Sequence, residues 1–201
     1  MAKIDLKKEM RELYNPPGKP VLADVPTMNY LMIDGIGDPV KSKDYMEAIQ
    51  TLYPLAYAIK FMVKKQGTDY GVMPLEGLWW ADDLEHFLDD RDAWKWTSMI
   101  MQPSFVMNDI VEAALEQVKQ KKALPAIDKV RFAALDEGKA AQVMHLGPFA
   151  DERPTIEKLH AFIVENGYER SGKHHEIYLT DPLKTAPGRM KTVIRQPVKL
   201  K

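Results

Sequence analysis

The sequence of 201 residues contains no cysteine. Disulfide bonds, thiolate metal sites and cysteine nucleophiles are therefore excluded, and redox chemistry by the protein's own side chains is not expected. The chain also lacks both the run of about 20 apolar residues that a membrane-spanning helix needs and the apolar stretch of a signal peptide. P-loop, Gly-x-Ser-x-Gly and dinucleotide-binding motifs are missing as well. We therefore expect a cytoplasmic protein without a cofactor.

Neither sign of charge dominates the sequence. The 28 lysines and arginines nearly balance the 29 aspartates and glutamates, so no broad field favours nucleic acid or a membrane as a partner. The basic run at residues 119–122 is interpreted as the solvated end of a helix, where cations are favoured. With 45% hydrophobic residues the chain can bury a sizeable core and is compatible with a monomer.

The second half of the chain repeats patterns of the first half. Residues 99–103 and 193–197 are strand-like runs that each end in Gln-Pro, and residues 75–80 and 175–179 are strand-like runs that each contain one glutamate. The differences in spacing fall in a helix and a loop, where changes of length are tolerated. We infer a duplication that places Glu76 and Glu176 in equivalent positions. If the copies pack as a pseudo-dimer, both carboxylates approach one central cleft.

The elements follow the same order in both copies. The first 19 residues are charged, are broken by Pro-Pro-Gly and are interpreted as a peripheral N-terminal arm. Residues 20–201 are predicted to form a single domain of two repeats, about 20–104 and 128–198, joined by a helix over 106–122. In the first repeat we expect strands at 21–23, 29–33, 70–80 and 94–102, with an acidic connection at 82–92. A helix is expected to begin at a cap formed by Ser42 or Asp44, to bend at Pro54 and to end at about Lys65. In the second we expect strands at 130–135 and 140–146 joined by a tight turn at 136–139, a helix after Pro154 that ends at Asn166-Gly167, and strands at 175–180 and 190–196.

Alternation along the strands predicts an acid surrounded by aromatic side chains. Glu76, Leu78 and Trp80 share one face of their strand, and Glu176 and Tyr178 form the matching set. Trp96 on the adjacent strand is expected to lie close to Trp80. Such a wall suits a flat, apolar or cationic ligand. Two simpler interpretations stay open: the aromatic residues are core packing, and Glu176 forms a salt bridge to Lys191 or Arg195.

Glutamate is rare in strands and costly to bury without a partner. A desolvated glutamate has a raised pKa, and the Tyr178 hydroxyl is able to donate a hydrogen bond to a developing oxyanion. Acid–base hydrolysis is therefore physically accessible, although the sequence alone does not establish it.

The histidines do not form a metal motif. His174 and His175 are neighbours on a strand and point to opposite faces, and no third ligand has a recognised spacing. His145 is expected to pack or hydrogen-bond near the end of its strand, and His86 and His160 are interpreted as surface residues. We expect no metal.

Several of these segments resemble a known family. Residues 143–149 (Val-Met-His-Leu-Gly-Pro-Phe), a helix, and residues 175–182 (His-Glu-Ile-Tyr-Leu-Thr-Asp-Pro) are similar to the GyrI-like small-molecule-binding domain. Residues 72–80 (Val-Met-Pro-Leu-Glu-Gly-Leu-Trp-Trp) resemble its stand-alone branch. The resemblance implies an α+β fold of duplicated strand-helix-strand-strand modules, with the helices on one side of an antiparallel sheet and a ligand cleft at the pseudo-twofold axis.

The resemblance also implies functions. In relatives fused to DNA-binding regions, an acid equivalent to Glu176 meets cationic aromatic drugs, and some stand-alone relatives hydrolyse the cyclopropane of DNA-alkylating natural products. Residues 1–20 are too few for a helix-turn-helix, so direct nucleic-acid binding is not expected. We predict Glu176 and Tyr178 as the catalytic residues. Glu76, Leu78, Trp80, Trp96 and Tyr70 are predicted to line the ligand pocket. The alternatives are a protein-interaction module, as in relatives said to inhibit DNA gyrase, and haem or tetrapyrrole binding, for which no histidine is clearly placed as an axial ligand.

Overall fold

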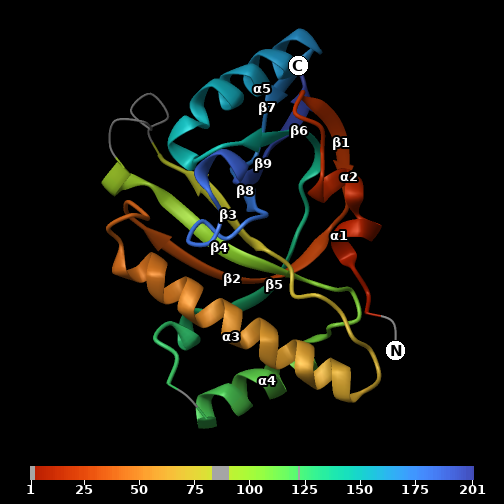
Figure 1. Cartoon of the computed structure of the whole chain (residues 1–201), viewed down its shortest axis with the longest axis vertical. Helices are drawn as coiled ribbons and strands as arrows, with labels where there is room; N and C mark the ends of the chain where they lie inside the picture. The colour runs from red at the N-terminus through yellow and green to blue at the C-terminus, as the bar shows by residue number, and fades with distance from the viewer. Residues whose placement is uncertain (1–2, 83–90, 122) are drawn as a thin grey trace. The chain divides into compact units, whose positions relative to one another are not determined.

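The computed structural model describes residues 3–82, 91–121 and 123–201 (Figure 1). Helices and antiparallel strands form an α+β fold, as predicted. The chain divides into two compact units, which are described separately. Unit 1 comprises Met1–Leu6 and Met28–Leu135, and unit 2 comprises Lys7–Thr27 and Asp136–Lys201. His86 of the predicted acidic connection lies outside the described residues.

In the part of unit 1 that the structure describes, four antiparallel strands are accompanied by two long helices, α3 and α4. The strands lie in the order β3-β4-β2-β5, and α3 contacts β2, β4 and α4. Figure 1 shows α4 beside α3. The bounds are β2 Met28–Ile36, α3 Lys43–Lys65, β3 Leu75–Trp80, β4 Lys95–Gln102, α4 Asn108–Lys121 and β5 Arg131–Leu135, with 3-10 turns at Arg91–Ala93 and Ile127–Lys129.

The long helix α3 begins and ends where the sequence predicts. The Ser42 hydroxyl accepts a hydrogen bond from the Tyr45 amide at 3.2 Å and so caps the first turn. Apolar residues at three-to-four-residue spacing, such as Leu52, Leu55 and Ile59, are fully buried. The helix continues through Pro54 to Lys65.

An aromatic cluster joins α3 to the sheet of unit 1. Trp79 on β3 is paired with Trp96 on β4, and the Tyr45 ring lies 5.7 Å from the first and 5.1 Å from the second. A side chain at position 35 of β2 would collide with the Trp96 ring, which explains the glycine there. The α3-facing side of the sheet therefore includes Trp79 and Trp96.

Unit 2 consists of antiparallel strands and one long helix, α5. Its strands lie in the order β1-β6-β9-β8, and the short β7 also pairs with β9. The α5 side of this sheet forms a core in which Val143 and Ile194 pack with Leu159 and Ile163 of the helix. The bounds are α1 Leu6–Glu9, α2 Arg11–Tyr14, β1 Val21–Val25, β6 Gly138–Leu146, α5 Arg153–Glu165, β7 Tyr168–Arg170, β8 His174–Tyr178 and β9 Lys191–Leu200, with 3-10 turns at Phe149–Asp151 and Pro187–Arg189.

Two strands pair differently from the prediction. β1 pairs with β6 of unit 2, and β5 pairs with β2 of unit 1. The predicted hairpin across residues 136–139 is therefore wrong, and each unit takes its outer strand from outside the predicted repeat. The alternating pattern of residues 21–25 and 131–135 identifies strands, but it carries no information about which strand is the partner.

The N-terminal segment is not a peripheral arm. Leu13 and Tyr14 of α2 are buried in unit 2. The backbone carbonyl of Glu12 accepts a hydrogen bond from Gln142 at 2.6 Å, and that of Leu13 accepts one from Arg195 at 3.0 Å. Because two buried polar side chains depend on these carbonyls, α2 is a structural part of unit 2. Among the described residues, no helix combines the length and apolar character needed to cross a membrane.

Candidate ligand site on strand β8

Strand β8 places the predicted catalytic pair on the side of unit 2 that faces α5. Glu176 is paired with Ile194 of β9, and Tyr178 is paired with Thr192. Directly paired residues of antiparallel strands share a face, and Ile194 belongs to the core under α5. His174, Glu176 and Tyr178 therefore point toward the same side of the sheet as α5.

The Glu176 carboxylate is held by two neighbours on its own strand. The Tyr178 hydroxyl donates a hydrogen bond to Glu176 Oε2 at 2.8 Å, and His174 Nε2 lies 3.0 Å from Glu176 Oε1. The side chains of His174 and Glu176 are each 15% exposed. The predicted pairing of Glu176 with Tyr178 is a direct contact. The alternative salt bridge of Glu176 to Lys191 or Arg195 is wrong: Arg195 is paired with His175 and bonds to Glu137 on the opposite face, and among the described residues the ionisable partner of the Glu176 carboxylate is His174.

A second acid, Glu152, lies beside Glu176. It follows the 3-10 turn Phe149–Asp151, immediately precedes α5 and is only 4% exposed. Its carboxyl group interacts with that of Glu176. Its Oε1 atom is buried and has no hydrogen-bond partner among the described residues. The second carboxyl group at this site therefore comes from Glu152, which the sequence does not predict, whereas the prediction paired Glu176 with Glu76.

The two acids have opposite pKa shifts. Burial, and then the charge of Glu176, raise the pKa of Glu152 to about 9. Burial would also raise the pKa of Glu176, but hydrogen bonds from His174, Tyr178 and Glu152 outweigh it and lower that pKa. The surroundings therefore favour the neutral form of Glu152 and the ionised form of Glu176. A neutral acid next to a carboxylate is an arrangement able to transfer protons in both directions.

Aromatic rings border this pair. The rings of Phe149 and Tyr178 meet edge to face, with centroids 5.4 Å apart. Phe149 is 42% exposed, so one ring of the pair is accessible from solvent. An exposed aromatic ring next to a carboxylate is suited to a planar or cationic ligand.

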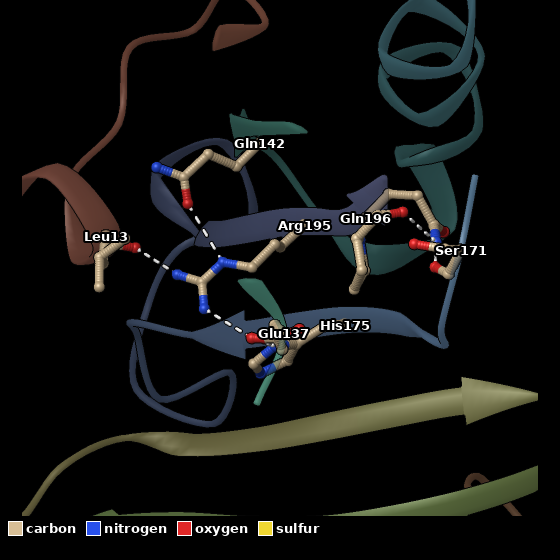
Figure 2. Close-up of polar contacts among 8 residues, drawn as sticks. Leu13, Glu137, Gln142, Ser171, His175, Arg195 and Gln196 are labelled. Carbon is tan, nitrogen blue, oxygen red and sulfur yellow. Dashed lines mark hydrogen bonds and ion pairs between the residues drawn. The ribbon is translucent and has the colours of Figure 1, made fainter. Parts of the chain in front are cut away.

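The opposite face of β8 carries a separate buried network, shown in Figure 2. Arg195 donates to Glu137 at 3.1 Å, to Gln142 at 3.2 Å and to the Leu13 carbonyl at 3.0 Å. His175 Nδ1 lies 3.0 Å from both carboxylate oxygens of Glu137. Burial alone would raise the pKa of Glu137, but His175 and Arg195 hold it at about 2. Because every member of this network has an internal partner, we assign it to the stability of unit 2.

Three histidine predictions have different outcomes. His145 bonds to Thr155 Oγ1 at 2.9 Å and lies 3.3 Å from the Pro148 carbonyl, which confirms its predicted role at the end of its strand. His160 is not a surface residue: its Nε2 is buried, and burial, followed by the charges of Arg170 and His174, lowers its pKa to about 4. Among the described residues no three His, Asp or Glu side chains are grouped to hold a metal ion.

The predicted pocket residues of unit 1 divide between two faces of their sheet. Glu76, which is fully buried, is paired with Met99, whereas Trp79 is paired with Trp96. Glu76, Leu78 and Trp80 therefore share the face away from α3, and Trp96 belongs to the α3-facing core. The predicted wall of Trp80 and Trp96 is wrong, because the strand register places these rings on opposite faces.

Tyr70 lies before β3 rather than on it. It is buried and meets Phe105 edge to face at 5.5 Å. Burial raises its pKa, and its hydroxyl has no hydrogen-bond partner among the described residues. Its part in a ligand pocket, like that of Glu76, Leu78 and Trp80, stays a prediction.

The two glutamates of the sequence repeat are not equivalent. Ile100 and Ile194 correspond in the Gln-Pro repeat, and the residues across from them are Leu75 and Glu176. Glu176 therefore corresponds to Leu75, one position before Glu76. Because side chains alternate along a strand, this slip places Glu176 on the side of its unit's helix and Glu76 on the side away from its own.

Glu152 and His174 are the functional candidates that the sequence analysis missed. Glu152 has no periodic pattern around it, and only its position three residues after Phe149, in a segment preceding a helix, distinguishes it. His174 was considered only as a metal ligand, although its two-residue spacing from Glu176 on a strand already predicts a shared face.

Comparison with known proteins agrees with this architecture. Residues 19–199 match the GyrI-like small molecule binding domain. An uncharacterised conserved protein from Listeria innocua is 42% identical with a TM-score of 0.89, and 98% of this chain and 100% of that chain are covered. A hydrolase from the same organism is 41% identical with a TM-score of 0.87 over the same shares.

More distant matches show the fold alone. The C-terminal domain of EcmrR has 15% identity and a TM-score of 0.58, with 91% of this chain and 98% of that domain covered. No curated protein matches the chain significantly. The match over residues 19–199 and the identity to the Listeria proteins lead to one conclusion: the chain belongs to the GyrI-like small molecule binding domain family.

Proposed function

We propose that this GyrI-like protein binds amphipathic aromatic or cationic small molecules at the β8 site and hydrolyses cyclopropanoid DNA-alkylating compounds, which would protect the cell that contains it. The observation that carries the proposal is the Glu176 carboxylate, held by His174 and Tyr178, together with the buried Glu152 carboxyl group beside the rings of Tyr178 and Phe149. The carboxylate suits a cation, and the rings suit a flat apolar group.

Catalysis is supported by two further points. Proteins named as hydrolases from Listeria innocua share 41% of their residues with this chain over almost its whole length. The pair also contains the groups that addition of water to a strained ring requires: a carboxylate that accepts a proton and an acid that supplies one.

The proposed reaction adds one water molecule to the substrate. Glu176 accepts a proton from water as the water oxygen bonds to a cyclopropane carbon. The strained carbon–carbon bond breaks, and its electron pair moves into the conjugated carbonyl group of the substrate. Once Glu176 is protonated, the Tyr178 hydroxyl turns from it and donates its one hydrogen bond to the oxyanion, and a proton from the acid pair completes the product. Substrate and water are the only reactants, and no oxidant or reductant is consumed.

Binding is tested by thermal shift with a panel of cationic and polycyclic aromatic compounds. We expect ligand-dependent stabilisation of the parent protein and its loss in Glu176→Gln, because the amide removes the negative charge. The matched control is Glu157→Gln on α5, which removes an exposed carboxylate whose partner is Arg153. Absence of stabilisation by every compound in the parent protein would refute the proposed binding function.

Turnover needs its own measurement. Incubation with a cyclopropanoid substrate should yield a product heavier by one water molecule, detected by mass spectrometry. Glu176→Gln should abolish it, while Glu157→Gln should leave it unchanged. Equal turnover in Glu176→Gln and the parent protein would remove Glu176 from the mechanism.

An exposed aromatic face on α3 supports the alternative of a protein-interaction module. Tyr57 and Phe61 are 47% and 53% exposed and their rings stack at 6.3 Å. If the chain inhibits DNA gyrase, a supercoiling assay should show inhibition that Tyr57→Ser with Phe61→Ser removes and Glu176→Gln does not. Gyrase activity that is unaffected by the parent protein would reject this alternative.

A further inference from the structure

The contacts of Glu152 and Glu176 bear on which of the two carboxyl groups is protonated. The backbone carbonyl of Glu152 accepts a hydrogen bond from the Ile156 amide at 3.0 Å, which fixes the residue at the start of α5. Glu176 already receives one bond on each oxygen, from His174 and from Tyr178. Ionised carboxylates only accept hydrogen bonds, so Glu152 and Glu176 can bond to each other only if one of them carries a proton.

The donors decide which of the two acids carries it. Glu176 has two donors on its own strand, and those donors favour its ionised form. Glu152 is almost fully buried, and its Oε1 atom has no hydrogen-bond partner among the described residues. A buried carboxyl group with so few donors is more stable as the neutral acid.

We propose that Glu152 is the proton-carrying partner of Glu176, so that the site offers one negative charge to a ligand and takes a second positive charge only by releasing this proton. The inference rests on the proposed ligand site and deepens it, because it makes the charge of the ligand a determinant of binding. In this scheme Glu152 donates to Glu176 and sets the charge that the site presents to a ligand.

The affinities of ligands with different charges should then depend differently on pH. A ligand with one positive charge is balanced by Glu176 alone, and its affinity is independent of the Glu152 proton. A ligand with two positive charges requires both carboxylates, so its affinity should rise roughly tenfold per pH unit until Glu152 is ionised.

The pH range of the measurements must avoid the titration of other ionisable groups around the acid pair. They are His174 and Tyr178 on β8, His160 on α5, and His145 on β6, which is paired with Thr192 of β9. Imidazoles titrate near pH 6.5 in model peptides and tyrosine near pH 10, so the measurements run from about pH 7.5 to about pH 9.

The first experiment measures the proton in the absence of ligand. Carbon-13 NMR of the glutamate carboxyl groups should show, at about pH 7.5, a protonated signal that disappears in Glu152→Gln. In Glu176→Gln the same signal should titrate closer to the ordinary glutamate range, since the neighbouring charge is gone. The inference is overturned if Glu152→Gln removes no protonated signal.

The second experiment compares ethidium, with one positive charge, and propidium, with two on the same aromatic ring system. Calorimetry in buffers of different ionisation enthalpy should show proton release on propidium binding and none on ethidium binding. Glu152→Gln retains a neutral donor toward Glu176 but has no proton to release, so proton release on propidium binding should disappear in this variant. Equal proton release with both dyes would overturn the inference.

The two experiments separate this inference from the proposed function. If neither dye nor any other aromatic ligand binds, the ligand function fails, and the NMR titration still decides whether Glu152 carries the proton. If ligands bind but Glu152 is ionised at neutral pH, the function stands and the inference fails.

Discussion

The two faces of the unit 2 sheet each contain a buried glutamate, and the two acids differ in protonation. Glu137, on the side away from α5, contacts His175 and Arg195, and its pKa is about 2. Glu152, on the side of α5, contacts the Glu176 carboxyl, and its pKa is about 9. Both are almost inaccessible to water, so burial does not explain the difference. The charge of the neighbouring groups does.

The comparison separates structure from function. Around Glu137 the charges compensate each other and link α2, β8 and β9, which is the pattern of a structural network. Around Glu152 two acids lie together, and among the described residues no ion pair joins Glu152 to a cation. Like charges held together are unfavourable for folding, and they are characteristic of sites that bind or transfer protons.

The largest effect is expected from Arg195→Met on the structural face. Removing the guanidinium leaves the buried Glu137 carboxylate without its arginine partner and the Leu13 carbonyl without its donor. The free energy of unfolding should fall by about 3–5 kcal/mol, measured by urea denaturation. Arg153→Met, which removes an exposed ion pair with Glu157, is the control and should cost less than about 1 kcal/mol. Similar losses in both variants would contradict the assignment of the Arg195 network to stability.

Low pH should also lower the free energy of unfolding, because Glu137, on the side of the sheet away from α5, becomes protonated. The pKa of Glu137 is about 2 when folded and 4.5 in the ordinary case, so its contribution is complete above pH 4.5 and is lost as the pH falls toward 2. The loss amounts to about 3 kcal/mol. Denaturation at a series of pH values should show it in the parent protein. Glu137→Gln should be less stable at neutral pH and should change less over this acidic window. An equal acidic slope in both proteins would contradict the assignment.

Much of this arrangement was accessible from the sequence because it depends on local patterns. The helices α3, α4 and α5 follow from caps and apolar spacing, and the contact of Glu176 with Tyr178 follows from their two-residue spacing on a strand. Partner choice between strands was not accessible. The sequence repeat suggested one equivalence, Glu76 with Glu176, and the register of the strands shows a different one.

The roles of Glu137 and Glu152 could not be predicted from the sequence. Glu137 was assigned to a hairpin turn, where a charged residue is unremarkable, and Glu152 stood among several acids before a helix. Their roles come from residues that are distant in sequence: Arg195 is 58 positions from Glu137. Such contacts depend on sheet topology, and no local pattern in a single sequence reports them.

Alkaline conditions should destabilise the side of the sheet that carries the proposed ligand site, whereas acid destabilises the side that contains Glu137. The folded pKa of Glu152 is raised, so folding is favoured most below pH 4.5, and stability falls as the pH rises toward about 9. The expected slope is about 1 kcal/mol per pH unit. Glu152→Gln cannot ionise, so its thermal midpoint should change less than that of the parent protein between pH 6 and pH 8. An identical alkaline slope in the two proteins would contradict the neutral state of Glu152.

Tyr178→Phe should have the smallest effect on stability. It should nevertheless change the pKa values of the acids on the α5 side of the sheet and not that of Glu137. It removes the 2.8 Å hydrogen bond to Glu176 and keeps the ring that packs against Phe149. The cost should be about 1 kcal/mol. Because Glu176 loses a donor, its pKa should rise and that of Glu152 should fall, which carbon-13 NMR of the carboxyl groups would detect. The signal of Glu137 should not move, since its partners are on the opposite face, and the exposed Tyr57→Phe should move neither. A shift of Glu137 equal to that of Glu152 would show that the two faces are coupled rather than independent.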